Sequence, residues 1–377
     1  MHLVHFSDTH LGFFEYAKID PETGLNQREQ DFYRAWWKVV DDILADPPDL
    51  VIHAGDLFHT PRPTNRAIRV ASEGLKKIGE AGIPVVLISG NHSTPRIRAT
   101  GSIFETLSLF PNVRAAFRGA YERFRVGAVA VHAVPHCATE EEMRAAFQSI
   151  ELDATAELNI LITHGSWQGR KVYSMGEFSE QLIPDVESLL GVRFDYIALG
   201  HYHRRVDVND HTSYSGSTER TSLNQRSADT GYLRVRWQGE ELQREFVTVP
   251  SRPMHRIELT PSPEASPSDI LAALEAEAAQ TPEGAIVDLA INGIRRETYL
   301  KLDLREVNGL FQDALVVERS IQLLSDEDGT GTAGEIGSLP EEFERFLARK
   351  DLLPDDRKRL LNLGLGFLTT VAETQGD

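Results

Sequence analysis

Short runs of apolar residues recur along residues 1–250 and alternate with longer segments that have a helical repeat. The runs are rich in Val, Ile and Leu and are bounded by Gly, Asp or Asn, which is typical of buried strands. The predicted strands are His2–Phe6, Leu50–Ala54, Pro84–Ser89, Leu158–Thr163 and Tyr196–Leu199. Apolar residues at three- and four-residue spacings predict helices at Gln27–Ala45 and Thr64–Ala81. This order predicts an α/β fold with a largely parallel central sheet covered by helices.

A second unit is predicted to follow, because Pro250-Ser251-Arg252-Pro253 has the composition of a domain boundary. Residues 251–324 are expected to form a small α+β domain that suits a cap or recognition module. Its predicted strands are Arg256–Leu259, Ala285–Ile291 and Leu315–Ile321, and its predicted helix is Ser268–Ala279. Residues 325–338 have the composition of a flexible linker. Within residues 339–377, two short amphipathic helices are predicted at Glu341–Arg349 and Asp355–Thr369.

Composition narrows the function. The chain has 377 residues, enough for one large core and a smaller unit, and it carries a net charge of −18. Such a charge argues against a module that binds nucleic acid by bulk electrostatics alone. Cys137 is the single cysteine, so any metal must be held by nitrogen and oxygen ligands. No signal peptide or apolar membrane span is predicted, and a cytoplasmic location is expected.

Side chains that can bind metals follow each predicted core strand. In an open α/β sheet the carboxyl ends of the strands meet at one crevice, so residues far apart in the sequence come together there. The candidate ligands are Asp8, His10, Asp56, Asn91, His164, His201 and His203. These residues stand in five short motifs, one after each predicted core strand. Any one of the motifs occurs often by chance. Five of them in order, each at the end of a strand, predict a single metal centre.

The number and kind of ligands favour two ions. Carboxylates, imidazoles and an amide suit Mn²⁺ first, with Fe or Zn²⁺ as possible occupants. Two ions about 3.5–4 Å apart that share a carboxylate would use all the groups, and Asp56 is the expected bridge. Asp8, His10, Asp56 and His203 are assigned to one ion, and Asp56, Asn91, His164 and His201 to the other. The expected chemistry is attack of an activated water on a phosphoester. His92 is predicted to protonate the leaving oxygen, and His59 to orient the substrate or stabilise the scissile phosphate.

These motifs resemble the calcineurin-like metallophosphoesterase superfamily, and in particular its DNA-repair nuclease branch of SbcD-like and meiotic recombination eleven-like nucleases. The branch is indicated by Gly55-Asp56-Leu57-Phe58-His59, Ala198-Leu199-Gly200-His201-Tyr202-His203 and Tyr214-Ser215-Gly216-Ser217. The resemblance spans roughly residues 1–250 and implies a sandwich of β-sheets flanked by helices. Residues 251–322 are similar to the family's capping domain in pattern only.

The resemblance also implies an activity and partners. Family members are manganese-dependent nucleases, exonucleolytic on double-stranded DNA and endonucleolytic on single strands or hairpins. They act with a coiled-coil ATPase of the SbcC or Rad-fifty type, which here would bind helices within residues 339–377, and they form homodimers. The family usually has Asp after Gly-Asn-His, whereas this chain has Ser93. A hydroxyl hydrogen-bonded to His92 would add no charge to stabilise its protonated form, which weakens the general-acid assignment.

Two alternatives stay open at this stage. The same pair of ions would serve a general phosphatase or a cyclic-nucleotide phosphodiesterase. The chain could also be a non-catalytic scaffold that binds an ATPase coiled coil through residues 339–377. The complete set of ligands favours an enzyme over the scaffold.

Overall fold

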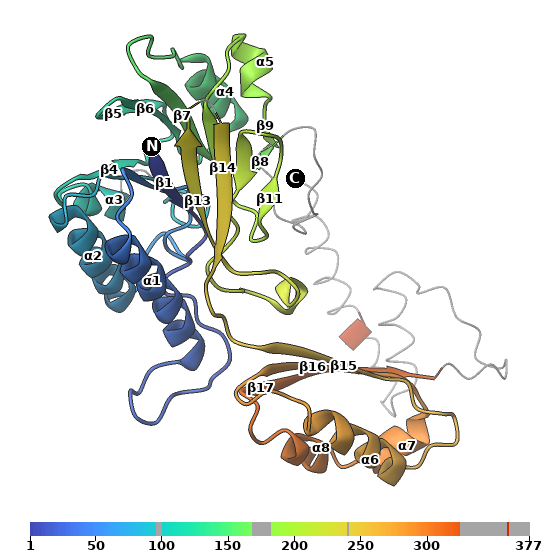
Figure 1. Ribbon diagram of the computed structural model, residues 1–377. Coiled ribbons are helices and arrows are strands. Elements are labelled where there is room, and N and C mark those ends of the chain that lie inside the picture. The colour runs from blue at the N-terminus through green and yellow to red at the C-terminus, as the bar shows by residue number, and fades with distance from the viewer. Residues whose placement is uncertain (96–99, 168–181, 240, 325–359, 362–377) are drawn as a thin grey trace.

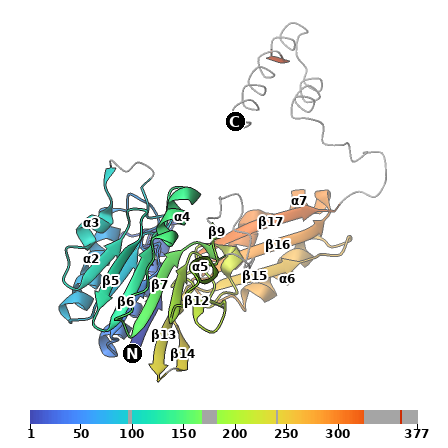
Figure 2. The same ribbon diagram turned by 90° about the horizontal axis from the view of Figure 1, so that it is seen from above.

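The computed structural model describes residues 1–95, 100–167, 182–239, 241–324 and 360–361 (Figure 1). Two six-stranded sheets form the larger part of the fold, and a three-stranded sheet with its helices forms a separate smaller part (Figures 1 and 2). None of the described helices is both long and apolar enough to cross a membrane.

The first sheet has the strand order β14-β13-β1-β2-β3-β4. Strands β1 to β4 run parallel, and β13 joins the edge of β1 in the antiparallel direction. The bounds are β1 His2–Phe6, β2 Leu50–His53, β3 Val85–Ile88, β4 Val113–Ala116, β13 Gly231–Gln238 and β14 Glu241–Thr248. The carboxyl ends of β1, β2 and β3 therefore lie side by side.

The second sheet has the order β11-β12-β10-β7-β6-β5, with β6, β7, β10 and β12 parallel. Its bounds are β5 Glu122–Val126, β6 Val129–Val134, β7 Leu158–His164, β10 Tyr196–Gly200, β11 Val206–Asp207 and β12 Thr212–Tyr214. A two-stranded sheet pairs β8 (Ser166–Trp167) with β9 (Leu182–Ile183). Strands β7 and β10 end next to each other, with Gly200 in register with His164.

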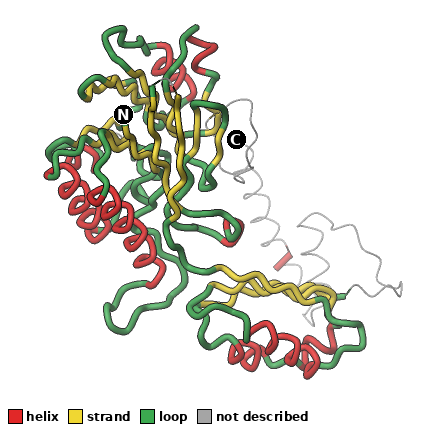
Figure 3. The backbone as a smooth tube through the Cα atoms, viewed as in Figure 1, coloured by secondary structure: helices red, strands yellow, loops and turns green. Residues whose placement is uncertain are grey.

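The two large sheets pack face to face. Leu3 and Ile52 of the first sheet belong to the same buried apolar cluster as Ile160, Ile162 and Tyr196 of the second. Helices cover the outer faces, so the layers are helix, sheet, sheet and helix (Figure 3). The helices are α1 Gln27–Ala45, α2 Asn65–Glu80, α3 Ile103–Leu107, α4 Glu140–Gln148 and α5 Val186–Leu190.

The smaller part is a parallel three-stranded sheet with helices on one face (Figure 3). Its elements are β15 Met254–Leu259, α6 Pro267–Ala278, β16 Ile286–Ile294, α7 Arg296–Lys301, α8 Leu304–Leu310 and β17 Val316–Leu323. It has its own apolar core, which includes Ile257, Leu274 and Leu289. These elements fall within the predicted small unit at residues 251–324, whose role as a capping domain stays a prediction.

Buried ionic contacts join the two parts. The carboxylate of Asp31 in α1 accepts hydrogen bonds from Arg252 Nη2 at 2.8 Å and Arg28 Nη1 at 2.7 Å. Arg252 Nη1 also donates to the carbonyl of Gly284 in the smaller part at 2.6 Å. Arg28 lies 3.6 Å from Glu219, and both side chains are 1% exposed. Because each buried charge has a partner, this cluster fixes the link around residue 252 to the larger part.

The prediction of an α/β fold with helices over sheets is confirmed, and α1 has the predicted bounds. The sandwich of central β-sheets flanked by helices, which the resemblance implies, is confirmed too. The strand pattern alone indicated a single largely parallel sheet, and in this it was wrong, because the predicted core strands divide between two sheets and β13 and β14 form an antiparallel hairpin. The predicted linker and C-terminal helices lie outside the described residues, apart from Leu360 and Leu361.

A buried histidine in β1 should make stability fall in mild acid. Burial lowers the pKa of His5 from 6.5 to about 3, and its Nδ1 lies 2.8 Å from the hydroxyl of Tyr196. Between those two pKa values the unfolded chain binds a proton that the folded protein does not, so stability falls as the pH drops below 6.5. From pH 7 to pH 5, His5 should cost about 2 kcal/mol of unfolding free energy.

Urea unfolding at both pH values, compared between the native protein and His5→Gln, measures this effect. The variant cannot titrate at this position, so its stability should fall by about 2 kcal/mol less over the same interval. Equal losses in the two proteins would contradict the assignment.

Candidate metal centre

The structure brings all seven predicted ligands to neighbouring loops at the carboxyl ends of β1, β2, β3, β7 and β10. Four of them adopt a backbone conformation that non-glycine residues rarely take: φ is +52° at Asp8, +42° at His10, +52° at Asp56 and +106° at His201. Non-glycine residues with positive φ are concentrated at functional sites. Such a strained backbone persists only where the surrounding fold holds it in place.

His164 lies among atoms that can only accept hydrogen bonds from it. Its Nδ1 donates to the carbonyl of Ala54 at 2.8 Å, so in the neutral ring Nε2 has a lone pair and no hydrogen. That Nε2 lies 3.2 Å from Asp56 Oδ2 and 3.0 Å from Asn91 Oδ1. Three acceptors that converge in this way need a positive centre between them, either a second proton on the ring or a cation.

The pKa shifts at this point show the same demand for positive charge. Burial by itself lowers the pKa of His164, but the neighbouring Asp56 carboxylate reverses this and raises it to about 9. Burial works against the charge of Asp56 as well, yet His164 holds the pKa of that carboxyl well below its usual range. A bound cation would take the place of this proton.

A second group of nitrogen and oxygen atoms also includes Asp8. His203 Nε2 lies 3.0 Å from His10 Nε2 and 4.0 Å from Asp8 Oδ1. Ligand atoms of Asp8, His10 and His203 lie within 4.8 Å of one another, and so do those of Asp8, Asp56 and His164. These two adjacent groups share Asp8, whereas the sequence had indicated Asp56 as the shared carboxylate, and together they are compatible with a dinuclear metal site.

His201 lies beside the His164 group. Its backbone N–H donates to Asp8 Oδ2 at 3.0 Å, and its ring lies 5.3 Å from that of His164 between centroids. Burial lowers the pKa of His201 to about 3, so the ring is neutral. Its Nε2 is buried and has no hydrogen-bond partner among the described residues, and the same holds for Nδ1 of His10. An unpartnered buried nitrogen is compatible with a metal ligand, but His5 Nε2 and His53 Nδ1 share this property, so it does not by itself identify one.

His59 and His92 lie next to these groups. Their rings stack at 5.2 Å between centroids, and His92 Nδ1 donates to the carbonyl of His59 at 3.1 Å. Ser93, which stands where the family usually has Asp, bonds elsewhere. The hydroxyl of Ser93 is buried and bonds to the backbone of Phe58, donating to its carbonyl at 3.1 Å. The orientation of His92 therefore comes from a backbone carbonyl.

Glycines allow the strands to approach the ligands closely. A Cβ on Gly90 would lie 2.4 Å from Asp56 Oδ1, and one on Gly55 would lie 2.3 Å from His164 Nδ1. Any other residue at either position would push a ligand aside. The glycine-flanked motifs of the sequence are thus explained by space at the site.

Several residues that support the ligands were missed at the sequence level. Ser7 donates a short hydrogen bond to Asp8, and its hydroxyl lies 2.9 Å from that of Ser215. Thr221 and Gln225 lie against the ring of His203. The motif from Tyr214 to Ser217 indicated Ser215, but hydroxyls and amides in turns are too common for the sequence to indicate the others.

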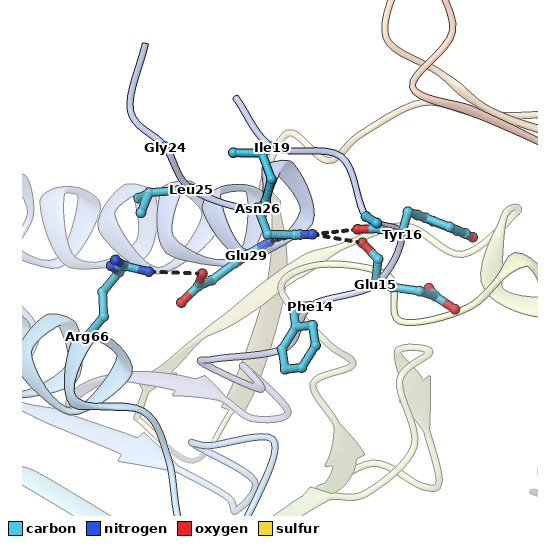
Figure 4. Close-up of a pocket in the computed structure, with 10 residues that line it drawn as sticks. Phe14, Glu15, Tyr16, Ile19, Gly24, Leu25, Asn26, Glu29 and Arg66 are labelled. Carbon is cyan, nitrogen blue, oxygen red and sulfur yellow. Dashed lines mark hydrogen bonds and ion pairs between the residues drawn. The ribbon is translucent and has the colours of Figure 1, made fainter. Parts of the chain in front are cut away.

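A separate cavity of about 570 Å³ opens beside the amino-terminal end of α1 (Figure 4). Its wall includes Phe14 and Ile19. Among its polar groups, Arg66 pairs with Glu29 at 3.3 Å, and the side-chain amide of Asn26 donates to the carbonyl of Glu15 at 3.2 Å. None of the seven ligands lines it. The metal centre and this cavity are therefore different features.

Known proteins match the larger part of the chain. The model of the calcineurin-like phosphoesterase family matches residues 1–205. A relative from Methanococcus maripaludis, named DNA double-strand break repair protein Mre11, is 32% identical over 237 residues, which cover 60% of this chain and 59% of that protein. Proteins of the same name match from Thermoplasma acidophilum (31% identity, 61% and 59% coverage) and Methanocaldococcus jannaschii (30% identity, 66% and 69%).

The matched region spans 59% of the length of the first two relatives, so the comparison does not reach the whole of those proteins. The family model does include every loop that carries a candidate ligand. Because that model covers more than half of the 377 residues, the chain belongs to the calcineurin-like phosphoesterase family of metal-dependent hydrolases.

Proposed function

We propose that this chain is a manganese-dependent DNA nuclease that acts in the repair of double-strand breaks. The observation that supports this most directly is the convergence of Asp56, Asn91 and His164 beside Asp8, His10 and His203 at adjacent strand ends. The name of the relatives from three archaea points to DNA as the substrate. Exonuclease activity on duplex ends and endonuclease activity on single strands or hairpins is the proposed form.

The seven side chains divide into two proposed sites. The His203 site consists of Asp8, His10, Asp56 and His203. The His164 site consists of Asp56, Asn91, His164 and His201. Divalent cations bound there would supply positive charge to the phosphate and lower the pKa of a water molecule toward neutrality.

The remaining polar residues position the substrate and move protons. The carbonyl of His59 holds Nδ1 of His92, so Nε2 is the atom from which a protonated His92 can donate to the leaving oxygen. The ring of His59, stacked on that of His92, lies where it can contact the phosphate. The carbonyl of Ala54 fixes the tautomer of His164 and keeps its Nε2 available.

The other parts of the chain receive proposed roles as well. Residues 251–324 would cap the nuclease domain (residues 1–250) and recognise DNA, and residues 325–338 would link them to the C-terminal helices. Helices within residues 339–377 would bind a coiled-coil ATPase of the SbcC or Rad-fifty type, and the nuclease would act as a homodimer in the cytoplasm. A partner that contributes DNA affinity would offset the net charge of −18.

The substrate proposal can be tested with a panel of phosphoesters. Purified protein loaded with Mn²⁺ should cut linear duplex and hairpin DNA. Removal of the metal with a chelator should abolish cutting, because the positive charge that the cations supply to the phosphate would be lost. Supercoiled DNA without ends and p-nitrophenyl phosphate serve as controls, measured at the same protein concentration. Rapid turnover of the small phosphoester without cleavage of DNA, with an ATPase partner present, would instead support a general phosphatase.

A further inference from the structure

The ring of His203 is held by two side chains from the turn at residues 221–225. Gln225 Nε2 lies 2.9 Å from His203 Nδ1, and Thr221 Oγ1 lies 3.2 Å from the same nitrogen. Gln225 ends a short 3₁₀ helix, Leu223–Gln225. Its backbone carbonyl accepts from the N–H of Ala228 at 2.7 Å, which anchors the turn.

The orientation of the Gln225 amide is fixed by the backbone. The N–H of Thr221 donates to Gln225 Oε1 at 2.9 Å, and Gln225 Nε2 donates to Thr221 Oγ1 at 3.0 Å. A flipped amide would place its NH₂ against the N–H of Thr221, so two donors would face each other. The atom that faces His203 Nδ1 is therefore a donor, and Nδ1 is an acceptor.

The donor from Gln225 also determines the state of the other nitrogen of the ring. A neutral imidazole with an accepting Nδ1 carries its hydrogen on Nε2. That Nε2 is the atom 3.0 Å from His10 Nε2, which means that it points into the proposed His203 site. To bind a cation there, the hydrogen must move to Nδ1, and the hydrogen bond from Gln225 must break.

His164 shows the opposite arrangement. Its Nδ1 donates to the carbonyl of Ala54 at 2.8 Å, so its Nε2 already has a free lone pair. His164 is thus already in the tautomer that can bind a cation, whereas His203 is held in the tautomer that cannot.

We propose that Gln225 is a positioning residue that disfavours the metal-binding tautomer of His203 and makes the His203 site the weaker of the two. The proposal rests on the metal assignment made under Proposed function. It adds that the turn at residues 221–225 sets how tightly the His203 site binds its ion, which is called the second ion below. Thr221 Oγ1 is the acceptor that receives Nδ1–H once the second ion binds.

Gln225→Glu tests this with almost no change in shape. One carboxylate oxygen can accept from the N–H of Thr221 and the other from Nδ1–H of His203, which favours the free lone pair on Nε2. In titration calorimetry with Mn²⁺, the native protein should bind one ion tightly, at the His164 site, and a second ion weakly, at the His203 site. In the variant the weak ion should bind about 10- to 100-fold more tightly, with the tight ion unchanged. Gln280→Glu adds the same charge on an exposed turn and should change neither constant.

Thr221→Val separates the tautomer from a simple effect of charge. It removes the acceptor for Nδ1–H without adding a charge, so it should weaken the second ion several-fold in the native background and have little effect when combined with Gln225→Glu. The tautomer itself can be read in the metal-free protein by long-range ¹H–¹⁵N spectra, with the His203 signals assigned from a His203→Gln variant. Nε2–H is expected in the native protein and Nδ1–H in Gln225→Glu.

The outcomes distinguish this inference from the proposed function. Two ions of unequal affinity, with no response to Gln225→Glu or a native ring already in the Nδ1–H form, would overturn the role of Gln225 alone. A native protein that binds no Mn²⁺ would overturn the metal assignment and this inference with it.

Discussion

His164→Ala should lower the rate of Mn²⁺-dependent DNA cleavage on the order of 10³-fold or more and reduce the bound metal from two ions to one. The imidazole Nε2 lies 3.2 Å from Asp56 and 3.0 Å from Asn91, so its removal leaves two oxygen ligands without the third member of the group. A cation supplies several kcal/mol of stabilisation to the transition state, and each 1.36 kcal/mol is a factor of ten in rate. Single-turnover cleavage of a labelled duplex and metal analysis by mass spectrometry measure both effects.

His211→Ala is a matched control for this experiment. His211 is also a buried histidine beside a carboxylate, 2.9 Å from Glu187. Its backbone carbonyl, however, accepts from the N–H of Ile197 near the start of β10, whereas His201 follows the end of that strand. The control should keep its cleavage rate and both ions, with at most a small loss of stability. Full cleavage by a clean preparation of His164→Ala would contradict the proposed mechanism, and Asp8→Ala provides an independent repeat.

The positions of the ligands could be predicted because each follows a short apolar strand directly. The run Leu50–His53 is buried throughout and ends two residues before Gly55, so the strand and its loop are both visible in the sequence. The same is true of β7, which ends at His164 itself. Parallel strands that run the same way then bring these ends together whatever the exact order of the sheet.

The division into two sheets was expected from the family resemblance alone and could not be predicted from the strand pattern. Residues with a period of two show that a segment is a strand but do not identify its neighbour. Leu3 pairs with Val235, more than 200 residues away, and the chain returns there through the hairpin of β13 and β14. The additional strands β5 and β6 carry no ligand, so nothing chemical marked them.

Contacts that orient the ligands were also beyond the sequence. Gln225 and Thr221 are ordinary turn residues until the fold places them against His203. The link between Arg252, Asp31 and the carbonyl of Gly284 is another example, because a lone arginine in a proline-rich turn is normally exposed. Such contacts depend on long-range packing, which a local pattern does not record.

Gly200→Ala should lower the free energy of unfolding by about 3 kcal/mol and should abolish metal binding as well. A Cβ at this position would lie 2.0 Å from the carbonyl oxygen of Ala54 and 2.9 Å from His164 Nδ1. Those two atoms form the hydrogen bond that keeps His164 in its metal-binding tautomer. The methyl group must therefore separate β2 from β10 or push His164 out of place, and either movement opens the His164 site.

Gly309→Ala is the same chemical change in a position where it should do no harm. Gly309 lies in α8, and a Cβ there would meet nothing within 4 Å. Because alanine favours the helix more than glycine does, the free energy of unfolding should rise by about 0.5–1 kcal/mol. Urea unfolding and Mn²⁺ calorimetry on the two variants compare an added methyl group at the site with one far from it. A Gly200→Ala protein that binds two ions with native stability would show that β2 and β10 need not approach so closely. The close contact between the two sheets would then not be what holds His164 in place.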